Sequence, residues 1–142
     1  MNQMALTRNQ EHYVIMTVIY NELDDYLYGD KDGEPREAST LIEEVAGIPY
    51  EEVSNYVKDT VYISLQKYGE IVKAYLPKLN DWKWDRIPAL SRAILIMSYT
   101  HFYFTEKVDK RIVINIAVDL AKKYVEEKQA KFINGILDKV LN

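Results

Sequence analysis

Histidine is the residue type best suited to acid-base or metal chemistry in this chain of 142 residues, because the sequence contains no cysteine. The two histidines, His12 and His101, are far apart, and neither belongs to a ligand spacing such as H-E-x-x-H. His101 lies in an aromatic run over residues 99–104, which favours a hydrogen-bonded packing role over catalysis. The histidines therefore predict neither a zinc site nor a general base.

Carboxylates and glycines complete the search for catalytic groups. The acidic pairs are neighbours in the sequence: Asp24-Asp25, Glu43-Glu44, Glu51-Glu52 and Glu126-Glu127. Neighbouring residues on a helix diverge by about 100° and cannot face one substrate atom together. None of the five glycines belongs to a phosphate-binding loop such as G-x-x-x-x-G-K-[ST]. The sequence therefore predicts a protein that is not an enzyme and that needs no cofactor or metal.

Basic side chains are unevenly distributed along the chain. Residues 1–76 contain 6 Lys and Arg against 14 Asp and Glu, whereas residues 77–142 contain 12 against 8. The formal net charge of −4 therefore conceals an acidic first half and a basic second half. A polyanion should bind to the C-terminal half, although solvated helix faces alone could produce the same division. Charge alone does not decide between these interpretations.

Length and composition indicate a single domain over residues 1–142. A chain of this size with 48% hydrophobic residues can bury a substantial core without disulfides. Residues 1–8 do not resemble a signal peptide, and no stretch reaches the roughly 18 apolar residues that a membrane-spanning helix requires. We therefore expect a soluble, cytoplasmic protein that does not enter the membrane.

The N-terminal half contains clear sequence signals for where helices begin and end. Thr7 and Gln10 have the spacing of a capping box, and apolar residues at intervals of three and four predict a helix that ends by Gly29. Residues 29–35 predict a charged loop whose aspartates lack the full spacing of a calcium-binding loop. A second capping box, Thr40 to Glu43, predicts a short helix ending at Gly47. Pro49 then opens a predicted helix of about 27 residues, roughly 40 Å long, which Pro77 ends.

Three further helices are predicted after a connector that contains Trp82 and Trp84. The first covers about 89–105 and is apolar nearly all round, the second is capped by Asp109 and covers about 110–124, and the third begins near Glu127. No strand pattern is present, so we expect an all-α fold of six or seven helices, with sub-bundles of about 1–76 and 77–142 that share one core. The predicted core includes Ile19, Val57, Leu65, Ile94, Ile114 and Ile136.

Residues 82–142 resemble the NusB family in the order and spacing of several motifs. The matching segments are Trp82, Asp85-Arg86-Ile87, Arg92-Ala93-Ile94-Leu95, the run from Val113 to Lys122, and the run from Lys131 to Lys139. The N-terminal half agrees with the family only in its helix layout and in Tyr20, which follows an apolar run.

This resemblance implies two small helical bundles packed across each other and a role in antitermination of ribosomal RNA transcription. In that role the family binds a single-stranded boxA RNA together with the small-subunit ribosomal protein NusE, and the pair joins RNA polymerase. Two alternatives stay open: an adaptor that has kept its protein partners but lost RNA, and a detached domain of the ribosomal RNA cytosine methyltransferases. Without a cysteine, this chain cannot itself transfer a methyl group by that mechanism. Homodimerisation is also left open.

The resemblance also implies a set of RNA-binding residues, which are Arg8, His12, Tyr20, Lys128, Lys131 and Phe132. Arg8 and His12 stand where the family carries an arginine-rich run, so we expect a weak phosphate contact at this end. Lys131 is the expected phosphate contact of the last helix. Phe132 is expected to stack on a base, but its place in the apolar stripe of that helix is equally consistent with a residue of the core. Gly135 is costly inside a helix, which predicts that a neighbouring group packs closely against it.

Overall fold

The computed structural model describes residues 5–28 and 37–142, with side chains described for 5–23 and 37–142. These residues form the α-helices α1 (Arg8–Tyr28), α2 (Ala38–Ala46), α3 (Asn55–Gln66), α4 (Tyr68–Tyr75), α5 (Ala89–Thr100), α6 (Lys110–Tyr124) and α7 (Glu127–Val140). No strand occurs in this part of the chain, so the all-α prediction is confirmed. The charged loop predicted over 29–35 lies outside the described residues.

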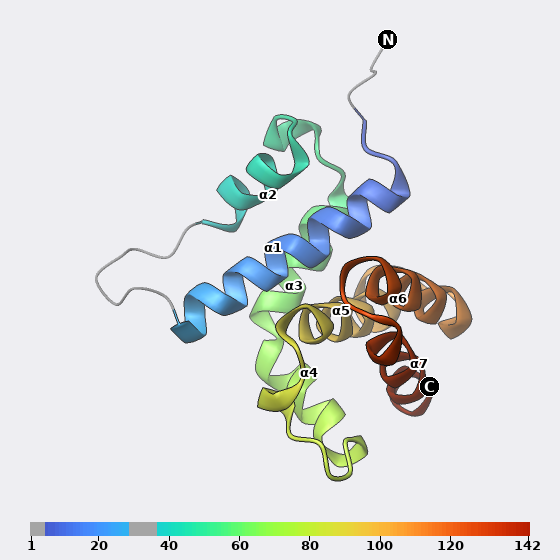
Figure 1. The fold of residues 1–142 in the computed structure, drawn as a ribbon. Coiled ribbons are helices and arrows are strands. Elements are labelled where there is room, and N and C mark those ends of the chain that lie inside the picture. Colours follow the sequence, from blue (N-terminus) through green and yellow to red (C-terminus); the bar gives the residue numbers. More distant parts are fainter. Residues whose placement is uncertain (1–4, 29–36) are drawn as a thin grey trace.

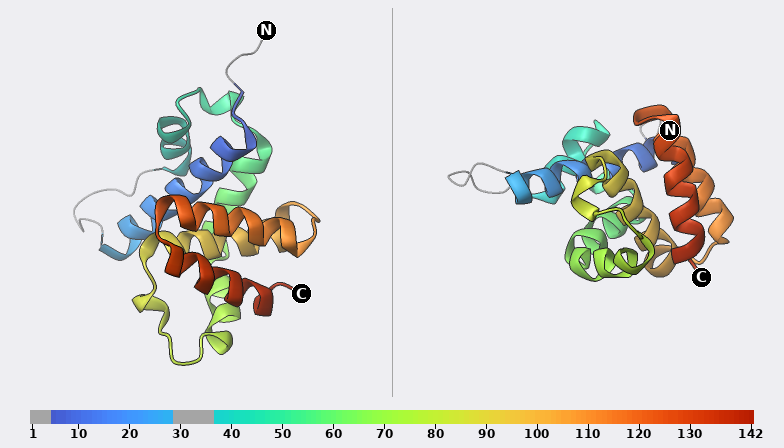
Figure 2. Two further views of the ribbon diagram at one scale, coloured as in Figure 1. Left: turned by 45° about the vertical axis from the view of Figure 1, so that its right-hand side comes forward. Right: turned by 60° about the horizontal axis from the view of Figure 1, so that its bottom comes forward.

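Helix α5 is the centre of the fold, as its apolar sequence predicts. Nine of its 12 residues are buried. It lies between α1 and the antiparallel hairpin of α6 and α7, and α2 lies at the opposite end of the molecule from that hairpin (Figures 1 and 2). The division into two sub-bundles stays a prediction, with its boundary falling after α4.

The predicted core is largely confirmed. Five of the six residues are buried, and these are Ile19, Val57, Ile94, Ile114 and Ile136. Leu65 is instead half-buried and packs against the edge of the core.

Two of the three predicted caps are confirmed. The Thr7 backbone N–H donates to Gln10 Oε1 at 2.8 Å, and the Gln10 N–H donates to Thr7 Oγ1 at 3.2 Å. Asp109 Oδ1 accepts from the backbone N–H of Arg111 at 2.8 Å. The Thr40 cap is wrong, because α2 already begins at Ala38 and Thr40 lies within its first turns. The end of α2 is as predicted, with Gly47 in the left-handed conformation at φ 71°.

The single long helix predicted from Pro49 to Pro77 is wrong. The segment is divided into a 3₁₀ turn at Tyr50–Glu52, then α3, then α4. Ser54 is extended and its hydroxyl accepts a hydrogen bond from the Val57 backbone N–H at 3.3 Å, so it starts a new helix. Lys67, with φ −101° and ψ 15°, separates α3 from α4. Apolar spacing persists across these breaks, which is why periodicity alone did not reveal them.

Candidate nucleic-acid interface

The connector between α4 and α5 places Trp82 on the surface. A turn reverses the chain here, with Asn80 at φ 55° and the Trp82 backbone N–H donating to Leu79 O at 3.0 Å. Asparagine tolerates the left-handed conformation better than most residues, which suits it to this position. The Leu79 side chain is buried, whereas Trp82 is 48% exposed. The turn is therefore anchored on one side and presents an indole ring on the other.

Trp84 fixes this connector against the helices. Its indole Nε1 donates to the Tyr68 hydroxyl at 3.0 Å, and its ring stacks on Tyr75 with centroids 5.8 Å apart. The Tyr75 hydroxyl in turn donates to Leu95 O in α5 at 2.6 Å. Burial, followed by the charges of nearby tyrosines, raises the pKa of Tyr75, so this hydroxyl remains a donor at neutral pH. The two connector tryptophans thus have different roles, one structural and one exposed.

Helix α7 supplies the other side of the interface. Its apolar stripe, which includes Ile133 and Leu137, is buried, so Lys131 and Lys139 lie on the exposed face. Phe132 is half-buried, and its ring lies 5.5 Å from the Trp82 ring at an angle of 45°. The aromatic pair therefore joins α7 to the connector.

A groove of about 230 Å³ follows this junction, and we call it the α7 groove. Its lining residues are Lys78, Leu79, Asn80, Trp82, Lys131, Phe132, Gly135, Ile136 and Lys139. This set contains three lysines and no carboxylate. The nearby Asp138 carboxylate is engaged by Lys110, whose Nζ lies 3.0 Å from Oδ1. The groove therefore combines positive charge with aromatic surface.

Gly135 has a different role from the predicted one. A Cβ built at this position meets no atom within 4 Å, so no neighbouring group packs closely against the glycine. Gly135 instead lines the α7 groove, where the missing side chain leaves space. Glycine inside a helix lowers stability, and at this position it leaves the surface of the groove open.

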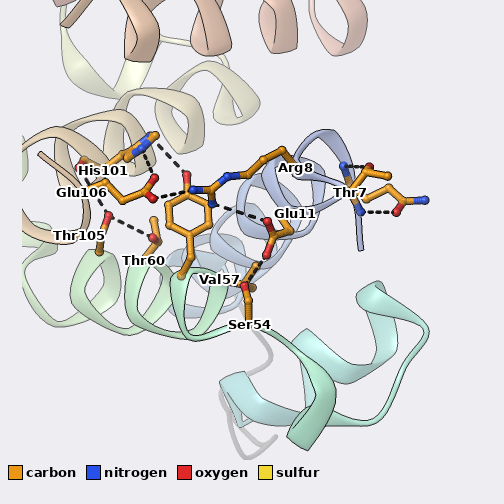
Figure 3. Close-up of polar contacts among 11 residues, drawn as sticks. Thr7, Arg8, Glu11, Ser54, Val57, Thr60, His101, Thr105 and Glu106 are labelled. Carbon is orange, nitrogen blue, oxygen red and sulfur yellow. Dashed lines mark hydrogen bonds and ion pairs between the residues drawn. The ribbon is translucent and has the colours of Figure 1, made fainter. Parts of the chain in front are cut away.

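Arg8, at the start of α1, is held by intramolecular contacts. Its Nη2 lies 2.5 Å from Glu106 Oε2, its Nη1 lies 3.6 Å from Glu11 Oε1, and its guanidinium carbon lies 3.9 Å from the centroid of the Tyr56 ring. Glu106 also contacts His101, whose Nε2 lies 2.8 Å from Oε1 (Figure 3). Figure 3 shows that these side chains join α1, α3 and the segment that follows α5. Arg8 thus stabilises the junction of three segments.

His12 is 6% exposed and packs beside the rings of Tyr56 and His101, with centroids 5.9 and 6.3 Å away. Burial, followed by the charges of His101 and Arg8, lowers the pKa of His12 to about 4. His12 is therefore neutral at neutral pH and does not present the phosphate-binding cation that the sequence suggested.

The pKa of Glu106, whose carboxylate contacts Arg8 and His101, is also shifted. Burial alone would raise the pKa of Glu106, but hydrogen bonds from Arg8 and His101 outweigh it, so the pKa is lowered. The pKa of His101 is lowered by burial, against the opposing effect of Glu106. Glu106 therefore stays ionised and continues to neutralise Arg8.

The structure brings together only part of the predicted set of binding residues. Lys131 and Phe132 line the α7 groove. Lys128 is exposed in the first turn of α7, and Tyr20 is half-buried against the core; neither lines the groove. Sequence reasoning missed the lining residues Lys78, Trp82 and Lys139 as binding candidates. The turn formers Asn80 and Asp81 directly before a tryptophan were the available signal, because connecting turns run over the protein surface.

The described residues contain neither a metal-binding cluster nor a membrane-spanning helix. No group of three or more His, Asp or Glu side chains there could hold a metal ion. No helix in the same ranges is long and apolar enough to cross a membrane.

Comparisons with known proteins agree on one family. The family model described as "NusB family" matches residues 14–142. A transcription antitermination protein NusB of Clostridium botulinum (strain Kyoto / Type A2) is 29% identical over 143 residues, covering 96% of this chain and 100% of that protein. The protein of the same name from Halalkalibacterium halodurans is 34% identical over 91 residues, covering 64% and 68%. A solved structure of T. maritima NusB matches with a TM-score of 0.76 and 18% identity, covering 96% and 92%.

Proposed function

The chain belongs to the NusB family, and on that premise we propose that it acts in transcription antitermination by binding a single-stranded, boxA-type RNA in the α7 groove. The observation that supports this most strongly is the composition of the groove, with three lysines, no carboxylate and an exposed indole packed on Phe132. The relatives named transcription antitermination protein NusB give the biological context.

The groove suits single-stranded RNA for physical reasons. Unstacked bases bind to aromatic faces, and each such contact contributes about 1–3 kcal/mol with little dependence on sequence. Trp82 is sufficiently exposed to accept a base, and Phe132 extends the same apolar surface. Lys131 and Lys139 both line the groove, where they can neutralise two phosphates of one strand.

We further propose that the RNA is bound together with NusE and that the assembly joins RNA polymerase in the cytoplasm. With Arg8 paired and His12 neutral, the N-terminal end contributes little electrostatic attraction. RNA binding by the chain alone should therefore be weak, and a protein partner should strengthen it by holding the RNA at a second surface. Lys128 adds charge one helical turn before Lys131.

Tryptophan fluorescence tests this proposal directly. A boxA-type RNA of 12 nucleotides should change the emission of Trp82, while Trp84, which is buried, gives a constant background. Lys131→Ala should weaken binding, and Lys122→Ala serves as a matched control because Lys122 is an exposed lysine on α6 outside the groove. Equal losses in the two variants, or an unchanged Trp82 signal on binding, would place the RNA elsewhere.

The adaptor alternative makes a different prediction for the same titration. If the chain binds NusE but no RNA binds even in the presence of NusE, the protein is an adaptor that has lost RNA recognition. If RNA binds only when NusE is present and Lys131→Ala abolishes that binding, the proposed function holds.

A further inference from the structure

A second pocket lies between the first turns of α1 and the later part of α6, and we call it the α1–α6 pocket. Its volume is about 150 Å³, and its lining residues are Asn9, His12, Ile116, Asp119, Leu120, Lys123 and Tyr124. No residue lines both this pocket and the α7 groove. A cavity of this volume can hold one six-membered ring, as benzene shows in an engineered protein cavity. The α1–α6 pocket therefore has room for one small ring.

His12 is the buried polar wall of the pocket. It is 6% exposed, its Nε2 is buried without a partner, and no hydrogen bond to its other ring nitrogen forms within the described residues. A neutral imidazole has one donor and one acceptor, and buried polar groups are normally hydrogen-bonded. His12 therefore leaves hydrogen-bonding capacity unused beside a pocket.

The mouth of the pocket offers further polar groups. Asp119 and Lys123 are exposed and lie four residues apart on α6, a spacing that permits an ion pair. None of the ion pairs within the described part of the chain involves either residue. Asn9 adds an exposed amide, which can both donate and accept. A ligand can thus find a carboxylate acceptor and two kinds of donor at this mouth.

Apolar and aromatic surface completes the pocket. Leu120 is buried and Ile116 is half-buried. The Tyr124 ring packs on Tyr13 with centroids 5.3 Å apart, and Lys123 Nζ lies 5.4 Å from the Tyr124 centroid. Apolar and aromatic walls with a few polar groups are typical of small-ligand sites, and aromatic faces bind unstacked bases.

We infer that the α1–α6 pocket binds one pyrimidine base of the RNA, with an N–H of the base donating to the Asp119 carboxylate. This inference rests on the proposed function. A pyrimidine is a single ring that carries at least one N–H donor and a carbonyl acceptor, so it matches both the volume and the polar groups of the pocket. Carboxylates are known to accept from base amino groups in specific recognition. Lys123 and Asn9 can donate to the carbonyl oxygen.

One strand can reach both sites. Tyr124 in the pocket and Lys131 in the groove are seven residues apart, which is at most roughly 25 Å along the chain. A strand of 12 nucleotides at about 3.4 Å each is roughly 40 Å long. Lys128 is exposed on the segment that joins the two sites, where it can contact the intervening backbone.

NMR of the His12 ring can detect occupation of the pocket in the wild-type protein. Its signals, identified by their disappearance in His12→Gln, should shift when uridine is added, with a Kd on the order of 1 mM because so small a ligand makes few contacts. 3-Methyluridine, in which a methyl group replaces the N–H hydrogen, is the matched probe and should not bind. The 12-nucleotide RNA, with NusE present, should shift the same signals.

Asp119→Asn gives a test whose sign is decisive. An aspartate that only lies near a polyanion repels it, so its removal should strengthen RNA binding. If Asp119 accepts an N–H of a base, Asp119→Asn should instead weaken binding about fivefold or more. Asp59→Asn is the matched control, because Asp59 is exposed on α3 and lines neither site. Thermal unfolding establishes that both variants are folded.

The possible outcomes separate the inference from the proposed function. If RNA changes Trp82 emission but leaves the His12 signals unmoved, RNA occupies the α7 groove and the base pocket is wrong. If uridine moves the His12 signals but no RNA binds with or without NusE, the pocket binds a free nucleoside, and its assignment to RNA fails together with the proposed function. Equal binding of uridine and 3-methyluridine, or unchanged or tighter RNA binding by Asp119→Asn, would overturn the Asp119 contact.

Discussion

The N-terminal end of α1 and the exposed face of α7 both place basic side chains beside aromatic rings, yet their charges are used differently. Arg8 lies 3.9 Å from the Tyr56 ring centroid, but Glu106 and Glu11 neutralise its guanidinium. Lys131 lines a groove beside Trp82 and Phe132 with no carboxylate in the lining. One region uses its charge to hold the fold together, and the other leaves its charge available to a ligand.

On the proposal that RNA occupies the α7 groove, a basic residue can lie beside aromatic rings without being a binding residue. What decides its role is whether the fold supplies an internal counter-ion. A polyanion must compete with Glu106 for Arg8, whereas no carboxylate lines the α7 groove. Substitutions at four residues test this contrast between the two regions.

The largest expected effect is a charge reversal in the groove. Lys131→Glu should weaken RNA binding on the order of tenfold or more at physiological salt, because a phosphate contact becomes a repulsion. Fluorescence titration measures the loss. The matched control is Lys122→Glu, which changes the net charge equally outside the groove. A similar loss in both variants would indicate that only net charge matters.

The next largest effect on RNA binding is expected from filling the space beside Gly135. Gly135→Leu should weaken RNA binding severalfold by filling the α7 groove, whereas Gly135→Ala should bind almost normally. Both changes should raise the free energy of unfolding, by up to about 1 kcal/mol for alanine, because glycine is a poor helix former. Urea denaturation and RNA titration of the two variants separate these effects. A marked loss of stability in the alanine variant would mean that a neighbouring group does pack against position 135.

At the other region, Arg8→Ala should affect stability more than binding. Removing Arg8 leaves Glu106 without its main partner, so we expect a loss of about 1 kcal/mol, a moderate value because the Arg8 side chain is 49% exposed. RNA affinity should change less than twofold. Thermal unfolding and RNA titration are the two measurements. Wild-type stability combined with a large loss of affinity would reverse the roles of the two regions.

The effect with the least bearing on RNA binding is a pH dependence of stability that originates at His12. Its pKa is about 4 in the folded protein against 6.5 for an ordinary histidine, so the unfolded chain binds more protons between these values. Stability should be complete above pH 6.5 and fall as the pH drops toward 4, by up to about 1.4 kcal/mol per pH unit for one histidine. The lowered pKa of Glu106 affects stability only below the ordinary glutamate pKa of 4.5.

The matched variant for this dependence is His12→Gln. Its stability, measured by urea denaturation between pH 7 and pH 4.5, should fall less steeply than that of the wild type. Part of the slope should persist, because the pKa of His101 is lowered in the same direction. Identical slopes in the two proteins would show that His12 is not buried as a neutral group.

Sequence was a good guide where one local interaction decides the structure. The caps at Thr7 and Asp109 and the apolar stripe of α7 follow from residue types at fixed spacing, and they were predicted correctly. The break at Ser54 was missed because a local hydrogen bond interrupts an apolar period that continues on both sides.

The candidate site was predictable only in part, because it depends on contacts between distant segments. Lys131 and Phe132 could be named from the resemblance to the family. The proximity of Trp82 depends on how the connector folds against α4, and the neutralisation of Arg8 depends on Glu106, 98 residues away. The role assigned to Gly135 was wrong because a sequence cannot show whether a glycine faces a neighbour or an open groove.

The salt dependence of RNA binding tests the contrast between the two regions most directly. The slope of log K against log salt should fall by about 0.7 in Lys131→Ala, the value for one phosphate contact on a single strand, and should stay unchanged in Arg8→Ala. Titrations at several salt concentrations, with NusE present to keep binding measurable, give both slopes. An unchanged slope in Lys131→Ala together with a reduced slope in Arg8→Ala would contradict the assignment of RNA to the α7 groove.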